Sequence, residues 1–286
     1  MQLSGSRVFS ETFRVVKERF GPLLGMLVSY WALQIVVMLI FMGLFGSILM
    51  TAMAGMNPQG NGMSGLGAGA VIGIILIYLV LIILGVAQNA SLCAIASPLR
   101  NASFGDAFKD GLRSAPTLFG VVLIGIVAYF VVALLVGLVM AGLIAALGTT
   151  GAVVSTILLF AGLIYVMARF IVLVPVVAVE QIGNPLKAIS RTWGLTGGNV
   201  FKIVLVTLVF FVVAGALFGV AFMPMFSAIT QAQLAGTVPD FSSMGTSFLL
   251  LFVIGIVLSM IGSAFQSVVH AELAGDSSAN LGDTFA

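Results

Sequence analysis

Arg169 is the residue whose type and position offer the clearest chemistry in this sequence. It is the only charged side chain between Ser114 and Val179, in an apolar stretch that predicts a membrane-spanning helix over residues 153–179. At 1.5 Å per residue it lies about 15 Å from the end of that span, near the middle of a hydrocarbon core about 30 Å thick. A charge at that depth costs at least about 2.5–3.5 kcal/mol on insertion scales, so Arg169 needs a partner.

The partner of Arg169 cannot be an acid at the same depth, because the expected spans contain no Asp or Glu there. The alternatives are the Ile171 carbonyl freed by Pro175, Glu180 reached through a kink, a bound anion or an amide side chain. Three amides qualify: Gln34, Gln88 and Gln266. Two interpretations stay open. Arg169 joins helices through carbonyls and amides, or it binds a lipid phosphate or another anionic amphiphile.

Other polar residues near the ends of the spans are candidates for lipid or ligand binding. Glu180 is expected to pair with a nearby Arg or Lys, while Arg191 and Trp193 belong to a basic amphipathic segment that favours anionic head groups. His270 has the position of a solvated residue at the end of a span. The sequence offers no catalytic set and no metal cluster, so we expect no enzyme, cofactor or metal site. The GxGxxG match at 60–65 follows no strand and indicates a flexible linker.

The composition determines what kind of element positions these residues. Of 286 residues, 61% are hydrophobic and 7% are charged, against roughly 25% charged in an average soluble domain. This excludes a secreted domain, a cytosolic enzyme and a nucleic-acid-binding protein. Apolar runs between turn signals predict six membrane-spanning helices: 22–52, 69–97, 117–147, 153–179, 200–226 and 246–269.

The basic residues predict the orientation of these spans. Ten of the 11 Lys and Arg residues lie before the first span, in the two loops that follow the second and fourth spans, or, for Lys202, at the start of the fifth span. The three remaining loops contain none. By the positive-inside rule, both termini face the cytoplasm, in the inner membrane of a bacterium. Arg169 is the basic residue that topology leaves unexplained.

A repeated pattern organises the chain into three similar units. Each unit has a short amphipathic helix that leads into two spans, and Phe13, Phe108 and Ile189 occupy equivalent positions. The units cover residues 6–99, 101–182 and 184–274, and the tail 275–286 resembles the start of a fourth. Gln88 corresponds to Arg169, which suggests a shared polar site between hairpins. The predicted fold is all-α, with three parallel repeats, although short basic loops in any membrane protein give a weak match of this kind.

The segment from Arg169 to Asn199 resembles a group of bacterial membrane proteins. The resemblance rests on ten positions of this segment: Arg169, Pro175, Glu180, Gly183, Ala188, Trp193, Leu195, Thr196, Gly198 and Asn199. The group comprises the YciC-like proteins and the membrane domain attached to some glycerophosphoryl diester phosphodiesterases. It commonly has Ser and Arg where this chain has Thr192 and Gly197. The resemblance implies a multi-span inner-membrane protein, and in the fused members catalysis belongs to a separate soluble domain.

Two functions are compatible with these features. The first is a non-enzymatic membrane protein that binds lipids, anionic ones in particular, or that scaffolds a complex of other membrane proteins. The second is a transporter of a small solute or lipid with a polar path near Arg169. Against the second, the spans hold no acidic residue to couple protons, and the chain has no nucleotide motif. The sequence predicts no nucleic-acid partner.

Overall fold

The structure is a computed structural model that describes residues 3–54, 68–237 and 241–285. The described chain is helical, and no strand occurs within those three ranges. The 60–65 motif lies outside the described residues. The helices follow one another in this order: α1 (Gly5–Glu18), α2 (Phe20–Ala54), α3 (Ala68–Ala96), α4 (Phe104–Leu147), α5 (Thr149–Phe170), α6 (Leu173–Glu180), α7 (Pro185–Thr196), α8 (Val200–Ala235) and α9 (Phe241–Phe285).

Six segments are long and apolar enough to cross a membrane, which confirms the prediction of a multi-pass membrane protein. They are Phe20–Ser47, Gly69–Ala96, Phe104–Leu147, Thr149–Glu180, Val200–Ala235 and Gly245–Gly275. Each overlaps one of the six expected spans. A run of 20 apolar residues forms a helix in lipid because only internal hydrogen bonds can satisfy its backbone there.

Three details differ from the expected spans. In α4, the amphipathic segment and the span form one continuous helix that passes through Pro116. The fourth segment is broken at 171–172. Helix α5 therefore ends at Phe170, one residue after Arg169, and α6 is a separate short helix. At the C-terminal end, α9 continues past the expected end of the sixth span, through Gly275 to Phe285.

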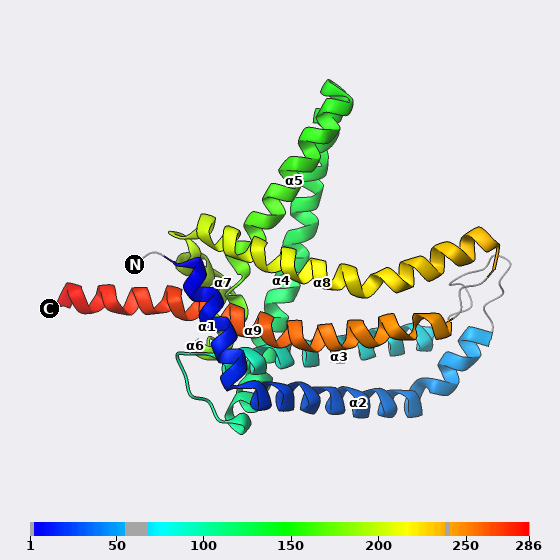
Figure 1. Cartoon of the computed structure of the whole chain (residues 1–286), viewed down its shortest axis with the longest axis horizontal. Helices are drawn as coiled ribbons and strands as arrows, with labels where there is room; N and C mark the ends of the chain where they lie inside the picture. The colour runs from blue at the N-terminus through cyan, green and yellow to red at the C-terminus, as the bar shows by residue number, and fades with distance from the viewer. Residues whose placement is uncertain (1–2, 55–67, 238–240, 286) are drawn as a thin grey trace.

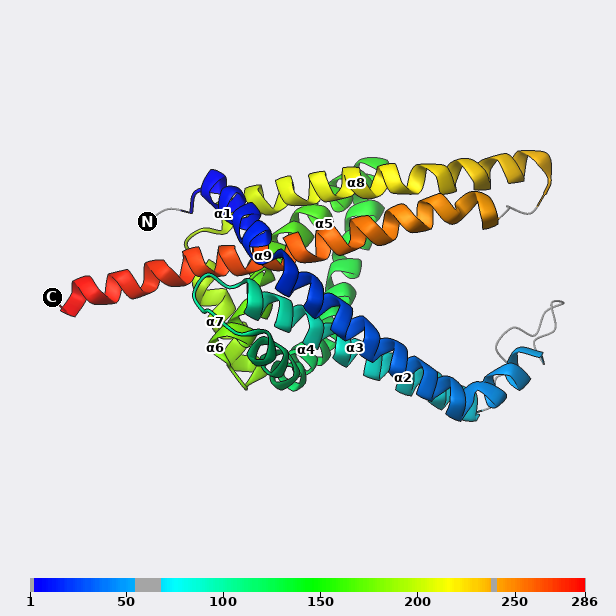
Figure 2. The same cartoon turned by 60° about the horizontal axis from the view of Figure 1, so that its bottom comes forward.

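The helices form three hairpins that leave a common end of the molecule, which we call the base. The base contains α1, α6, α7, the start of α4 and the ends of α3 and α9 next to them. Hairpins α2–α3 and α8–α9 leave the base toward the same side, whereas α4–α5 projects in another direction (Figures 1 and 2). The two described hairpin tips reverse at glycines with positive φ, Gly148 and Gly236. The directions of the hairpins therefore do not confirm a parallel threefold repeat.

Tight packing is concentrated in the base. A continuous buried cluster there includes Met26, Leu92, Val176 and Phe265, whereas the helices nearer the tips expose most of their apolar side chains. A close helix contact lies at Gly111 of α4, where a β-carbon would overlap Ser91 Oγ and lie 2.5 Å from the Ala87 carbonyl oxygen. Small residues permit such approach between membrane helices.

The three amphipathic segments each bury a narrow face of small or medium side chains. Thr12, Ala107 and Ala188, each one residue before the equivalent positions of the predicted repeat, are 1%, 0% and 0% exposed. The neighbouring apolar side chains Phe13 and Trp193 are exposed. Each segment thus has a face toward the base, an exposed apolar face and a polar face, as an interfacial helix of a membrane protein requires.

Candidate functional site

Helix α7 is the element that brings most of the predicted site residues together. Its start is fixed locally, because the Asn184 side chain accepts hydrogen bonds from the backbone N–H groups of Leu186 and Lys187, at 2.9 and 3.2 Å. Pro185 occupies the first turn, where its missing N–H costs nothing. The helix carries Arg191 and Trp193, and it contacts the segments that carry Arg169 and Glu180.

The Arg169 guanidinium joins the end of α5 to the end of α7. Its Nε donates to Tyr165 Oη at 3.1 Å, and its Nη1 donates to the Trp193 carbonyl oxygen at 3.1 Å and to Thr196 Oγ1 at 3.3 Å. Thr196 can accept this bond because its own hydroxyl proton goes to the Thr192 carbonyl, at 2.9 Å. Arg169, itself in the last turn of α5, therefore satisfies a carbonyl and a hydroxyl group in the last turn of α7, where a cation is favoured.

Aromatic rings flank the same guanidinium. The Cζ atom of Arg169 lies 4.4 Å from the centroid of the Trp193 ring and 5.3 Å from that of Tyr165. The two rings meet edge to face with centroids 6.2 Å apart, and Phe170 lies 6.1 Å from Trp193. We call Arg169, Tyr165, Trp193 and Thr196 the arginine clamp. Stacking on Trp suits Arg because its guanidinium is planar and weakly hydrated.

The clamp leaves one charge and one nitrogen unmatched. No carboxylate of the described residues forms a salt bridge with Arg169, and no described group accepts a hydrogen bond from its Nη2. Arg169 is half-buried, and Trp193 is 43% exposed. The neighbouring Gly197 adds no side chain to the site. The remaining hydrogen-bonding capacity of Arg169 suits an anionic oxygen.

The protein groups that bind Arg169 in the structure differ from all those predicted for it. The carbonyl is that of Trp193 rather than Ile171, and the expected amides and Glu180 do not contact the guanidinium. The depth estimate assumed one straight helix to Val179, whereas α5 ends at Phe170. Tyr165 could have been recognised, since it lies four residues before Arg169 on the same helix. Thr196 could not, because its proximity depends on tertiary packing.

Glu180 forms a second polar cluster, shared by three helices. Its carboxylate accepts hydrogen bonds from Arg191 Nε at 2.9 Å and Nη2 at 3.3 Å, which bears out the expected pairing with a basic residue. His270 Nε2 of α9 lies 2.9 Å from Glu180 Oε1. The expectation of a solvated His270 is wrong: its side chain is 0% exposed, because α9 continues past it and packs against the base.

Gln88 lies apart from the arginine clamp. Its Oε1 accepts a hydrogen bond from Gln34 Nε2 at 3.0 Å, so the amide joins α2 to α3. No hydrogen bond of the described residues links Gln88 to Arg169, and the shared polar site suggested by their equivalent positions is not formed through direct contact.

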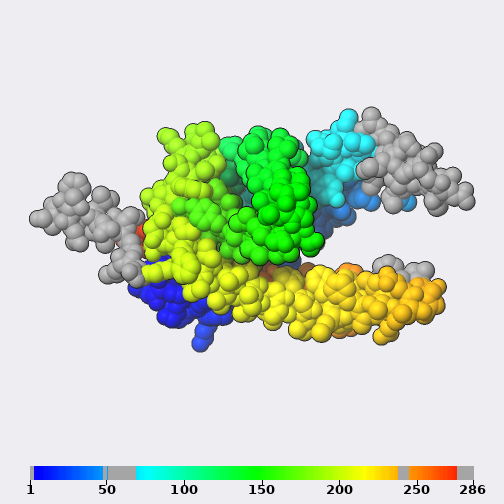
Figure 3. All heavy atoms as spheres, turned by 90° about the horizontal axis from the view of Figure 1, so that it is seen from above, coloured from blue at the N-terminus to red at the C-terminus, as the bar shows by residue number. Residues whose placement is uncertain are grey.

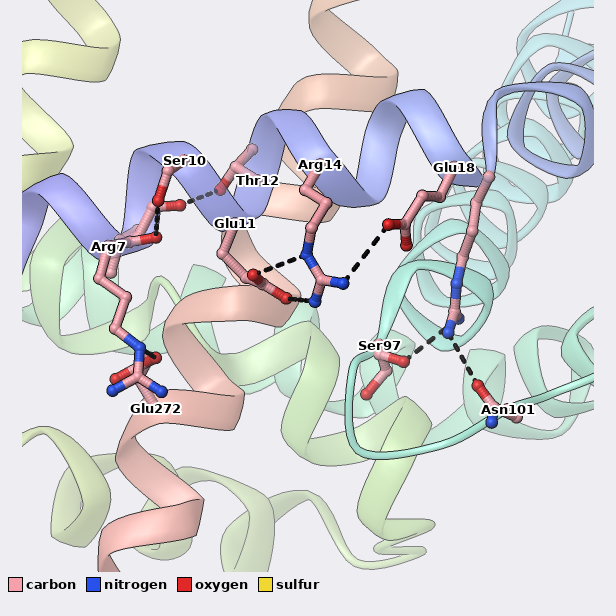
Figure 4. Close-up of polar contacts among 11 residues, drawn as sticks. Arg7, Ser10, Glu11, Thr12, Arg14, Glu18, Ser97, Asn101 and Glu272 are labelled. Carbon is pink, nitrogen blue, oxygen red and sulfur yellow. Dashed lines mark hydrogen bonds and ion pairs between the residues drawn. The ribbon is translucent and has the colours of Figure 1, made fainter.

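Both arginines of α1, Arg7 and Arg14, have protein partners in the base (Figure 4). Arg7 pairs with Glu272 of α9 at 3.0 Å, and Arg14 pairs with Glu11 and Glu18 of its own helix. Hydrogen bonding to Arg14 lowers the pKa of Glu11, so both groups stay charged in neutral solution. The arginine charge of α1 is therefore largely matched inside the protein, in contrast to that of Arg169.

Comparisons with protein-family models, with curated proteins and with solved structures found no match to this chain.

Proposed function

We propose that this protein is a non-enzymatic membrane protein that binds anionic phospholipid through the arginine clamp. The observation that carries the proposal is the half-buried guanidinium of Arg169, which has no carboxylate partner among the described residues and retains an unbonded Nη2. A phosphate oxygen supplies both the missing charge and the missing acceptor.

The surroundings of Arg169 favour a lipid as the source of that phosphate. Arg169 lies in one of the six apolar segments, and Tyr and Trp side chains like those of the clamp are enriched at the level of lipid head groups. The exposed faces of Trp193 and Leu186 on α7 give the acyl chains an apolar neighbour. A soluble anion would lack this apolar contact.

The proposal also covers the orientation of the protein in the membrane and the origin of its three units. The base faces the cytoplasm of a bacterial cell, because the basic residues gather there. The three units are divergent copies of one ancestor, an idea supported by the buried residues Thr12, Ala107 and Ala188 at equivalent positions. The similarity of the 169–199 segment to the YciC-like proteins is part of the same proposal.

The lipids that co-purify with the protein test this function. After extraction in mild detergent, mass spectrometry should find phosphatidylglycerol or cardiolipin enriched over the bulk membrane. Arg169→Gln should reduce this enrichment by roughly fivefold, the change that corresponds to about 1 kcal/mol for one basic residue at an anionic surface. Arg169→Lys should retain part of it, since the charge remains and the planar fork is lost.

Arg113→Gln is the matched control, because Arg113 is an exposed arginine of the base outside the clamp. It should leave the lipid content unchanged. Equal enrichment in the wild type and in folded Arg169→Gln would contradict the proposed function.

A further inference from the structure

A second polar feature lies within the spans and away from the arginine clamp. Where α2 and α3 leave the base, Tyr30 Oη and Ser91 Oγ form a buried hydrogen bond of 2.9 Å. One turn toward the tip, Gln34 and Gln88 form the half-buried hydrogen bond described above. We call Gln34 and Gln88 the amide pair.

The amide pair leaves half of its hydrogen-bonding groups unused. The bond from Gln34 Nε2 to Gln88 Oε1 leaves the Gln34 carbonyl oxygen and the Gln88 amino group without a partner among the described residues. Exchanging oxygen and nitrogen in both side chains gives the same result with the roles reversed. In either arrangement the pair offers one acceptor and one two-proton donor.

A third amide, Gln266 of α9, lies near Cys93 of α3. Gln266 Oε1 is 4.0 Å from Cys93 Sγ, and the same sulfur lies 3.5 Å from Asn89 Oδ1, next to Gln88 in sequence. The Gln266 amino group also has no described partner. Gln266 thus lies beside the face of α3 that carries Asn89 and Cys93, and no hydrogen bond of the described residues links it to the amide pair.

The bilayer reaches this region because hairpins α2–α3 and α8–α9 separate there. Trp31 and Phe252 are in contact across the two hairpins, with ring centroids 5.1 Å apart. Beyond them the hairpins diverge toward their tips, and Figure 3 shows open space between them. An amide N–H facing hydrocarbon with no acceptor costs several kcal/mol on alkane transfer scales, so a polar partner from the bilayer is strongly favoured.

The partner must be uncharged. No charged residue occurs between Phe20 and Leu99, nor between Lys202 and Asp240, and α9 has none between Phe241 and Val269. An ionised head group would therefore be buried here without a counter-charge. A hydroxyl group next to an ester carbonyl matches the free acceptor and the free donor of the amide pair.

We propose that the amide pair binds the polar end of an uncharged lipid of the diacylglycerol type. The glycerol hydroxyl donates to the free amide oxygen, and an ester carbonyl accepts from the free amide N–H. The acyl chains lie between the diverging hairpins. This site is independent of the phosphate proposed at Arg169.

Tryptophan fluorescence distinguishes the two sites, because the chain has only two Trp residues. In a Trp193→Phe protein only Trp31 emits, three residues from Gln34. The protein is reconstituted in phosphatidylcholine nanodiscs and titrated with diacylglycerol brominated on its acyl chains. Quenching of Trp31 should saturate at a low fraction of this probe and should exceed the quenching by equally brominated phosphatidylcholine.

The double variant Gln34→Leu/Gln88→Leu should weaken this binding by roughly tenfold, since two neutral hydrogen bonds are lost. Gln88→Met, which keeps the volume, serves if the double variant does not fold. Gln233→Leu, at an exposed position near the tip of α8, is the matched control and should bind as before. Quenching that equals that of phosphatidylcholine, or that persists unchanged in a folded amide variant, would overturn the proposal. Neither outcome changes the proposal that Arg169 binds a lipid phosphate.

Discussion

At the scale of single residues, the arginines of the described chain differ in the kind of partner they have. Arg7, Arg14 and Arg191 have carboxylate partners, whereas Arg169 has carbonyls, hydroxyls and aromatic rings. Dipoles and rings orient a guanidinium without cancelling its charge. Arg169 is therefore held in a fixed position while it retains its attraction for an anion.

The Glu180 cluster gives a residue-scale prediction about stability. Glu180→Gln should reduce the free energy of unfolding by about 1–3 kcal/mol, because the buried His270 and the paired Arg191 both lose a charged acceptor. Arg191→Gln should cost less than about 1 kcal/mol, since this side chain is 41% exposed. Equilibrium unfolding in detergent measures both. Equal losses in the two variants would contradict the assignment of the larger role to the contact with His270.

The sequence contained part of the site and not the rest. Arg169, Glu180, Arg191 and Trp193 could be chosen from their types and positions, and they do meet around α7. The pairing of Glu180 with a basic residue was predicted, whereas the partners of Arg169 were not, because they depend on how the end of α5 packs against α7. The break at 171–172 itself had a signal in the sequence, because Pro175 frees the Ile171 carbonyl four residues before it.

At the scale of elements, the contact between α3 and α4 leaves no room for a larger side chain at Gly111. Gly111→Ala should destabilise the protein by about 1–3 kcal/mol, because the new methyl group overlaps Ser91 and the backbone of α3. Thermal unfolding in detergent, followed by circular dichroism, tests this.

Gly105→Ala is the control on the same helix. A β-carbon at Gly105 meets nothing within 4 Å, so the substitution should be neutral or slightly stabilising through its higher helix propensity. If the two alanine variants melt at the same temperature, the close approach of α3 and α4 is incorrect.

The elements themselves were predictable where one physical signal dominates. Six apolar runs predicted six spans correctly, because a backbone in lipid must form its hydrogen bonds within the segment and an apolar run does this as a helix. The amphipathic segments were also visible as stripes at helical spacing. Whether such a segment fuses with its span, as in α4, or stays separate, as α7 does from α8, depends on one or two residues at the junction.

At the scale of the whole molecule, the three hairpins share one packed base and present mostly lipid-facing surface toward their tips. Such a shape gives lipids access to the side chains of several helices near the base. Both proposed lipid sites, the arginine clamp and the amide pair, lie where the hairpins leave the base. Their chemical difference, one charged and one neutral, predicts that they select different lipids.

The orientation of the molecule can be tested with cysteine labelling in spheroplasts. A membrane-impermeant thiol reagent should label Thr150→Cys and Thr237→Cys, which are exposed near two hairpin tips, and should fail to label Ser190→Cys in the base until the membrane is permeabilised. Native Cys93 is buried and should stay unlabelled throughout. Labelling of Ser190→Cys in intact spheroplasts would reverse the proposed topology.

The central claim is that Arg169 holds an anionic head group beside Trp193, and the fluorescence of Trp193 tests it most directly. In a Trp31→Phe protein, Trp193 is the only emitter. Brominated phosphatidylglycerol should quench Trp193 saturably and more strongly than brominated phosphatidylcholine, and Arg169→Gln should abolish the difference. Equal quenching by the two lipids in the protein with Arg169 intact would contradict the claim.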